Sequence, residues 1–159
     1  VYYLEAGLRT YNLDHPYPEE GYRQMISRIS DVNLCPTTLS KDNLLHELVK
    51  GESHVVGNTV LDNLLPYKEK CEYHNKVLVT LHRRENQEGS FLNKKIIVCR
   101  ETTERPEGKK SGHIFICKKP ERLHGIFNIL KYNYEIEEEC PYGDGYSSLK
   151  ILKLLNEGL

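Results

Sequence analysis

The chain has 159 residues, of which 38% are hydrophobic and 28% charged, enough for one ordinary domain or two small ones. Its 22 Lys and Arg residues nearly balance its 23 Asp and Glu residues, so the net charge of −1 excludes a general attraction to nucleic acid or to a membrane surface. No apolar run is long enough to span a membrane. The sequence begins with Val1 inside a predicted strand, which indicates a fragment or a gene prediction that lost its start, and nothing in the sequence argues for export.

Apolar strands and helices alternate along the chain. In chain order we predict a strand at 1–6, a helix at 19–31, a strand at 32–35, a helix at 39–51, a strand at 54–56, a helix at 59–70, strands at 76–81, 94–99 and 113–117, and helices near 119–131 and 145–157. In the helix at 39–51, Thr37 or Thr38 provides the cap, Leu44 and Leu48 share a face, and Gly51 ends the helix.

Two other helices carry local signals. Met25, Ile26 and Ile29 lie on one side of the helix at 19–31. Pro66 is expected to bend or end the helix at 59–70, because proline lacks the backbone N–H that a helix interior requires.

Strands that are apolar throughout and separated by helices predict an α/β fold, with a parallel sheet covered on both faces. We expect two lobes joined near residues 57–76, with a first domain at 1–75 and a second at 76–159. The polar loop at 86–95 is too short for the crossover between parallel strands. Either the strands on its two sides are antiparallel, or a segment has been removed there.

Ionisable residues follow the ends of the long strands. Glu5 follows the first strand, His82 the strand at 76–81, and Arg100 the strand at 94–99. Because ligands of parallel α/β sheets bind beyond the carboxyl ends of the strands, this recurrence predicts a site at that edge. The alternative for each residue is a solvated loop, and for Glu5 a surface pair with Arg9.

Three motifs have both a structural and a functional interpretation. Glu19 and Glu20 follow Pro18, an arrangement that favours a helix start through the helix dipole, and on that motif alone the structural interpretation is preferred. The run from His82 to Arg84 suits a diphosphate, or is simply a charged loop. The segment "PYGDGYSS" suits an anion at a helix N-terminus, or is a tight turn capped by Asp144.

The five cysteines contain no CxxC pair. Cys35, Cys99 and Cys117 lie in apolar runs, where a reduced cysteine behaves as a small core residue. This usage favours a reducing cytoplasm, and the absence of paired ligand spacing argues against a zinc site.

Seven segments occur in the order found in one family: "EAGLRT", "PYPEE", "PTTLSKDNLL", "GNTVLDNLL", "VTLHRREN", "VCRETTERPEG" and "PYGDGYSS". They resemble the non-hydrolysing UDP-N-acetylglucosamine 2-epimerases over most of the chain. The resemblance implies two Rossmann-like domains in a GT-B-like arrangement, with the nucleotide sugar in the cleft between them.

The chain also departs from the family pattern. Relative to the family it lacks an N-terminal portion, which carries basic substrate contacts and a catalytic Asp, and most of the second domain between "HRREN" and "RETTERPEG". Leu81 replaces the family's glycine before His82, and Tyr22 replaces its asparagine before the helix arginine.

The resemblance implies roles for four residues. Glu5 and Glu19 match the catalytic carboxylates, His82 faces the UDP leaving group, and Arg100 contacts the nucleotide sugar. Glu5 and His82 would also contact substrate, no metal or cofactor is needed, and a homodimer is expected as in the family. UDP departure from C1 would acidify the C2 proton, which one carboxylate takes and another group returns on the opposite face.

Two functions remain open. The first is an epimerase that interconverts UDP-N-acetylglucosamine and UDP-N-acetylmannosamine. The second is an inactive, internally deleted remnant that at most binds UDP or a protein partner. A glycosyltransferase of the same architecture is a distant third, because it would not need both "PYPEE" and "RETTERPEG".

Overall fold

The computed structural model describes residues 1–67, 95–99, 106–132, 136 and 138–157. The chain divides into two compact units, the first made of Val1–Asp62 with Tyr142–Leu159 and the second of Asn63–Pro141. It leaves the first unit after Asp62, within the predicted joining range of 57–76. The sequence assigned everything from 76 to 159 to the second domain, whereas the C-terminal segment from Tyr142 belongs to the first unit.

The first unit is built on a three-stranded sheet. Strands β1 (Tyr2–Leu4), β2 (Val32–Cys35) and β3 (Glu52–Val55) lie in the order β1-β2-β3, and both pairs are parallel. All four residues of β2 are buried. The prediction of an α/β fold with a parallel sheet is therefore confirmed.

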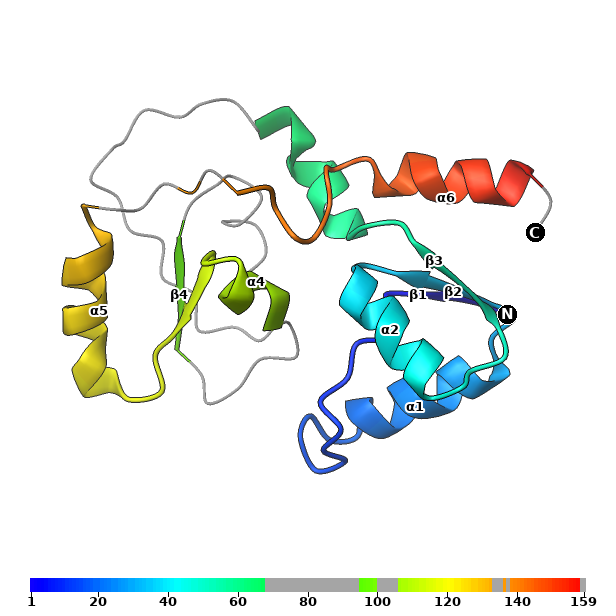
Figure 1. Ribbon diagram of the computed structural model, residues 1–159, viewed down its shortest axis with the longest axis horizontal. Coiled ribbons are helices and arrows are strands. Elements are labelled where there is room, and N and C mark those ends of the chain that lie inside the picture. The colour runs from blue at the N-terminus through cyan, green and yellow to red at the C-terminus, as the bar shows by residue number, and fades with distance from the viewer. Residues whose placement is uncertain (68–94, 100–105, 133–135, 137, 158–159) are drawn as a thin grey trace. The chain divides into compact units, whose positions relative to one another are not determined.

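Helices cover both faces of this sheet. Helices α1 (Glu19–Ile29) and α2 (Thr38–His46) lie on one side and α6 (Ser147–Asn156) on the other (Figure 1). Side chains of β2 alternate between the two layers, as expected for a strand. Val32 and Leu34 face Ile151 and Leu154 of α6, and Cys35 packs with the α2 side. This burial explains why α6 belongs to the first unit.

The start of α2 agrees with the sequence, but its end does not. Thr37 caps the helix, its Oγ1 accepting a hydrogen bond from the Ser40 N–H at 3.2 Å, and Leu44 is buried. The helix stops at His46, before Leu48, which adopts a left-handed φ of 54° and is 83% exposed. Leu48 therefore does not share the buried face with Leu44, because the helix ends before Leu48.

Helix α1 turns its apolar side outward. Met25, Ile26 and Ile29 share one side, as predicted, yet all three are exposed. The buried residues of α1 are Glu20 and Ser27, which contact polar groups of the segment that follows β1. The spacing of the apolar residues correctly predicted that they share one side of α1. The opposite, polar side is the buried one, because Glu20 and Ser27 find hydrogen-bond partners there.

Two sequence-distant motifs meet where the chain leaves and re-enters the first unit. The chain continues as the 3₁₀ helix η1 (Thr59–Tyr67), which contains Pro66. Gly57 and Gly143 touch so closely that a Cβ added to Gly143 would lie 3.2 Å from Gly57 Cα. Asp62 accepts hydrogen bonds from the backbone N–H groups of Ser147 at 2.9 Å and Ser148 at 2.6 Å. A carboxylate from η1 therefore caps α6 and ties the chain's return to its exit.

Asp62→Ala is expected to loosen α6. The change removes a charged cap that satisfies two amides at a helix N-terminus, so the docked helix should lose about 1 kcal/mol. Hydrogen exchange at the amides of α6 measures this loss. Asp14→Ala, which removes an exposed loop carboxylate, is the control and should leave α6 unchanged. Equal protection of α6 in both variants would contradict the cap.

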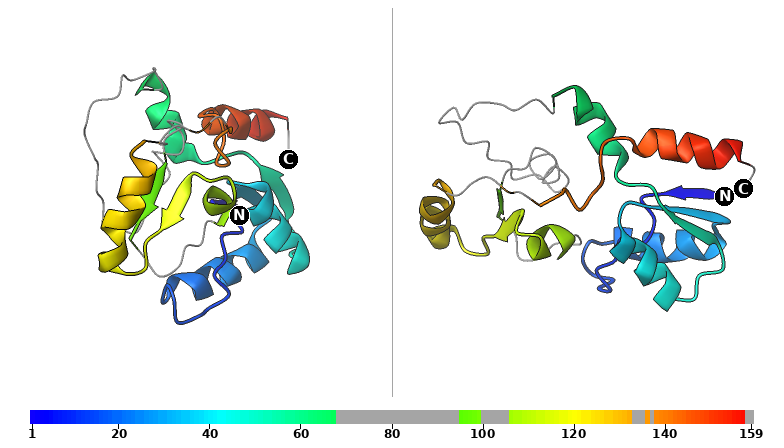
Figure 2. Two further views of the ribbon diagram at one scale, coloured as in Figure 1. Left: turned by 60° about the vertical axis from the view of Figure 1, so that its left-hand side comes forward. Right: turned by 45° about the horizontal axis from the view of Figure 1, so that its top comes forward.

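The second unit contains a two-stranded parallel sheet, β4 (Ile96–Val98) with β5 (Ile114–Ile116). The sheet lies between α4 (Pro106–Lys110) and α5 (Leu123–Leu130), with η2 (Pro120–Arg122) leading into α5 (Figure 2). The predicted strand at 76–81 lies outside the described residues, so its pairing with 94–99 stays a prediction. Every helix in the described ranges is too short or too polar to cross a lipid bilayer.

Candidate functional site

Glu5 lies immediately beyond the carboxyl end of β1. Its backbone has a left-handed φ of 57°, and its side chain is half-buried. The next residues are held in place, because Ala6 N–H donates to Leu34 O at 3.1 Å and Asn43 Nδ2 donates to Gly7 O at 2.9 Å. The carboxylate of Glu5 thus projects from a backbone that is tied to both β2 and α2.

Glu19 is the first residue of α1, and Arg23 lies one turn later on the same helix. An Arg23 guanidinium nitrogen lies 3.9 Å from Glu19 Oε2, and the other lies 3.9 Å from Glu20 Oε2. Arg23 therefore lies between two glutamates that differ in exposure, since the Glu19 side chain is 39% exposed and that of Glu20 is fully buried. The sequence contained a signal for this contact in the i,i+4 spacing of Glu19 and Arg23.

Glu20 has a structural role. Its carboxylate accepts hydrogen bonds from the backbone N–H groups of Thr10 at 3.0 Å and Tyr11 at 3.2 Å, and from Gln24 Nε2 at 2.9 Å. Burial alone would raise the pKa of Glu20, but these hydrogen bonds outweigh burial and lower it below 4.5. Of the two adjacent glutamates, Glu20 anchors the segment after β1 and Glu19 keeps the exposed carboxylate.

Arg9 is also structural, and it does not pair with Glu5. Its Nε lies 2.7 Å from Glu47 Oε1 and its Nη2 lies 3.0 Å from Glu47 Oε2, a bidentate ion pair. Nη2 also donates to Ser27 Oγ at 2.8 Å. The sequence alternative of a surface pair between Glu5 and Arg9 is therefore wrong, because Arg9 is buried against α1 and α2.

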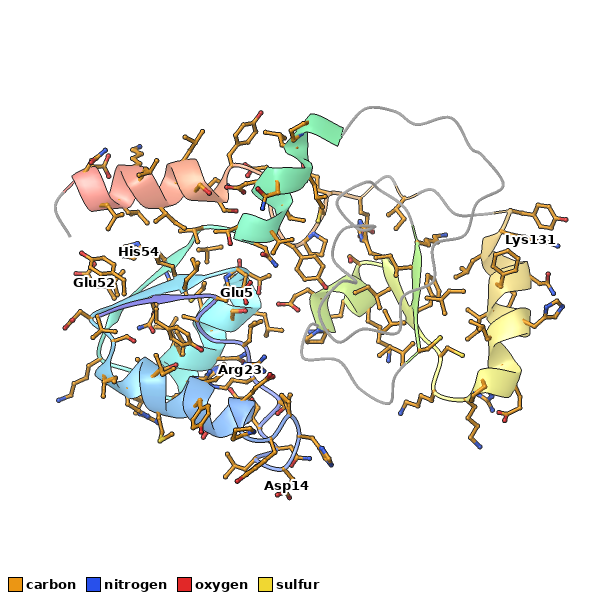
Figure 3. All side chains as sticks on the ribbon, turned by 180° about the vertical axis from the view of Figure 1, so that it is seen from behind. Glu5, Asp14, Arg23, Glu52, His54 and Lys131 are labelled. Atoms are coloured by element: carbon orange, nitrogen blue, oxygen red, sulfur yellow. The ribbon has the colours of Figure 1, made fainter. Side chains whose placement is uncertain are left out.

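Tyr3 lies near these charged groups. Burial raises the pKa of the Tyr3 phenol, and it lies within electrostatic range of Arg9, Arg23, Glu5 and Glu20. Figure 3 shows Glu5 and Arg23 at the end of the sheet where β1 passes into its following segment. Glu19 thus pairs with Arg23 at the start of α1, and Glu5 lies near Tyr3 at the end of β1.

Other predicted site residues have different outcomes. His82 and Arg100 lie outside the described residues, as does the charged run from 100 to 105. In "PYGDGYSS", Asp144 accepts from Tyr146 N–H at 3.1 Å, and the Asp62 carboxylate already occupies the first amides of α6. The turn interpretation fits this segment better than an anion site. Within the described ranges, no three His, Cys, Asp or Glu side chains gather as metal ligands would.

Acid is expected to weaken the second unit before the first. His113 of the second unit is fully buried, with Nδ1 2.8 Å from Ser111 Oγ, and burial lowers its pKa below 6.5. The unfolded chain therefore binds a proton more readily, so this stability is present above pH 6.5 and is lost as pH falls through the folded pKa. Glu20 contributes stability above pH 4.5 that is lost only below that value.

Hydrogen exchange of each unit between about pH 7.5 and about pH 4, corrected for intrinsic rates, tests this order. His113→Gln should remove the first loss, and His124→Gln, at an exposed histidine of α5, should not. Simultaneous loss of protection in both units would contradict the assignment.

Comparison with known proteins gives one family. The family model described as UDP-N-acetylglucosamine 2-epimerase matches residues 1–90. The UDP-N-acetylglucosamine 2-epimerase of Salmonella borreze is 44% identical over 106 residues, covering 55% of this chain and 28% of that protein. That of Bacillus subtilis is 26% identical over 250 aligned residues, covering 98% of this chain and 65% of that protein. The chain spans less than two thirds of the length of either relative. The alignment with the Bacillus subtilis protein covers 250 positions, more than the 159 residues of this chain, so this chain must be gapped in that alignment.

Solved structures share the fold. A UDP-N-acetylglucosamine 2-epimerase structure from Listeria monocytogenes aligns with a TM-score of 0.84 and 23% identity, over 98% of this chain and 66% of that one. The Neisseria meningitidis enzyme bound to UDP-GlcNAc aligns with a TM-score of 0.79 and 23% identity, over 99% of this chain and 70% of that one. These structures support the GT-B-like, Rossmann-type assignment of the fold.

Proposed function

Because the chain belongs to the UDP-N-acetylglucosamine 2-epimerase family, we propose that its site serves the interconversion of UDP-N-acetylglucosamine and UDP-N-acetylmannosamine. The proposal is supported by the position of Glu5 just beyond the carboxyl end of β1 and by the contact of Glu19 with Arg23, 3.9 Å away at the start of α1. In this proposal the first compact unit corresponds to the C-terminal part of the first Rossmann-like domain, and the second unit to a shortened second domain.

The proposed chemistry requires two events at the sugar. The C1–O bond to UDP breaks, positive charge develops at C1, and the C2 proton becomes acidic enough for a carboxylate to remove. Re-addition of UDP with proton return on the other face gives the epimer. Glu5 and Glu19 take the proton-transfer roles, and His82 and Arg100 stabilise the diphosphate and hold the nucleotide. Arg23, 3.9 Å from Glu19, restricts the position of that carboxylate.

A chimera tests the carboxylates separately from the completeness of this chain. Residues 1–67 would replace the matching segment of the Bacillus subtilis relative, and epimerisation would be followed by NMR. Glu5→Gln or Glu19→Gln in an active chimera is expected to lower kcat by about 10²–10⁴-fold. Glu52→Gln, at an exposed carboxylate of β3, is the matched control and should leave kcat unchanged. Full activity in both site variants would overturn the roles of Glu5 and Glu19.

We propose further that the 159-residue chain alone binds UDP weakly and does not turn over. The support for this proposal is that the chain covers only 65% of the Bacillus subtilis relative. The groups of an active site act together, so the loss of one essential group removes most of the catalytic rate. In deuterated buffer, the C2 proton of UDP-N-acetylglucosamine should not exchange, and Arg100→Ala should abolish UDP binding. Exchange that disappears in Glu19→Gln would instead establish an active enzyme.

A homodimer and a cytoplasmic location also belong to the proposal. The exposed apolar side of α1, formed by Tyr22, Met25, Ile26 and Ile29, supports association with a second copy of the chain. Sedimentation should show a dimer that Ile29→Glu dissociates, and a monomer at all concentrations would reject it. Cys35, Cys99 and Cys117 are free thiols, which supports a reducing compartment, and cell fractionation tests that location.

A further inference from the structure

Two cysteines are neighbours at the ends of β4 and β5. Cys99 directly follows Val98, and Cys117 directly follows Ile116, the residue with which Val98 is paired in the parallel sheet. Cys117 N–H donates to Val98 O at 2.8 Å, so the pairing continues to the cysteines. Neighbouring strands lie about 4.8 Å apart, within the Cα separation of about 4.4–6.8 Å that a disulfide requires.

The two side chains lie on one face of the sheet. Residues paired in register across parallel strands point to the same side, and the residues that follow them both point to the opposite side. Cys99 and Cys117 therefore share a face, with Cys99 half-buried and Cys117 buried. Both are free thiols, and burial together with the adjacent Cys117 thiol raises the pKa of Cys99.

We propose that Cys99 and Cys117 form a reversible redox pair that closes to an intramolecular disulfide in the presence of a small-molecule disulfide such as oxidised glutathione. The sequence predicted both cysteines to be small core residues, and their register in the sheet makes them neighbours that can react with each other. This inference is independent of the proposed epimerase function, because it depends only on the geometry of the second unit.

The chemistry is a two-step thiol–disulfide exchange. The more accessible Cys99, as thiolate, attacks one sulfur of oxidised glutathione, forms a mixed disulfide and expels one glutathione thiolate. Cys117, as thiolate, then attacks the Cys99 sulfur and expels the second glutathione thiolate. The two cysteines lose two electrons, glutathione disulfide gains them, and the two cysteine protons pass to the two glutathione thiolates.

Cys35 provides an internal comparison. It is fully buried in the first unit, and burial raises its pKa to about 12. The two thiols differ in access, because Cys35 has no exposed surface that glutathione could reach, whereas Cys99 is only half-buried. Cys35 should remain reduced under conditions that oxidise the Cys99–Cys117 pair.

The test is redox titration of the full chain. The protein is equilibrated in glutathione buffers of increasing oxidised fraction, free thiols are alkylated, and peptides are identified by mass spectrometry. We expect the Cys99–Cys117 cross-link to exceed any other cysteine pairing by at least about tenfold, because neighbouring thiols have a high effective concentration. Dithiothreitol should reverse it, and Cys35 should be recovered reduced.

Variants make the assignment decisive. Cys117→Ser, and Cys117→Ala in case the serine folds poorly, should stop the reaction at a glutathione adduct on Cys99. Cys140→Ser should leave the cross-link unchanged. Absence of the Cys99–Cys117 peptide at every glutathione ratio, or equal amounts of cross-links to Cys71 and Cys140, would overturn the proposal.

Discussion

Gly7→Ala is expected to lower the free energy of unfolding of the first unit by about 3 kcal/mol or more. Gly7 has a φ of +81°, and a Cβ there would lie 2.0 Å from Ser40 O and 3.2 Å from Leu44 Cγ. The nearest atom belongs to the backbone of α2, so relief requires the helix to move. Hydrogen exchange of the β2 amides measures the loss in the full chain.

Gly21→Ala is the matched control. Gly21 lies inside α1, and a Cβ there would meet no atom within 4 Å. Alanine is the better helix former, so this variant should gain about 0.5–1 kcal/mol. Equal effects at the two positions would contradict the steric argument. The Gly7 result also bears on the candidate site, because the same turn presents Glu5.

Arg9→Met is expected to cost about 3 kcal/mol. The Arg9 side chain has no exposed surface and the Glu47 side chain is 13% exposed, so removing the cation leaves a carboxylate largely cut off from water. Ser27 Oγ loses its hydrogen bond from Arg9 at the same time. Protection of the β2 amides again provides the measurement.

Two comparisons separate the buried ion pair from lost packing. Arg9→Met combined with Glu47→Leu should recover most of the stability, since replacing both charges removes the unpaired carboxylate. Lys153→Met breaks an exposed pair with Glu157 at 3.7 Å and should change stability by no more than about 0.5 kcal/mol. If Arg9→Met and Lys153→Met lowered the free energy of unfolding equally, burial would contribute nothing to the Arg9–Glu47 ion pair.

Local sequence patterns predicted strands and helix starts well, because both depend on residues that are close together in the sequence. The apolar run at 32–35 became a central parallel strand, because such a strand is covered on both faces. Thr37 capped α2 because capping depends on residues within one turn. The predicted end of α2 was wrong, because Leu48 has a left-handed backbone conformation. Leucine seldom adopts that conformation, so no local sequence pattern predicts it.

The candidate site was predictable in part. The motif segments singled out Glu5 and Glu19, and the structure describes Glu5 beyond the end of β1 and Glu19 beside Arg23, while their joint role in a site stays a prediction. The sequence could not predict that Glu20 is buried and structural while Glu19 is exposed. Both are acids in the first turn of a helix, and only the amides of Thr10 and Tyr11 distinguish the buried one from the exposed one.

The sequence by itself determined the α/β class, the order of the described strands and helices apart from α4, which it did not predict, and the family, because these depend on periodicity and on motifs read along the chain. Only the tertiary structure decided that Glu47 binds Arg9, that Asp62 caps α6, and that the C-terminal helix packs on the first sheet. Asp62 and Ser147 are 85 positions apart. Contacts at that range have no local signature, because many carboxylates along the chain could accept from the open amides of a helix N-terminus, and the tertiary packing of apolar surface decides which one does.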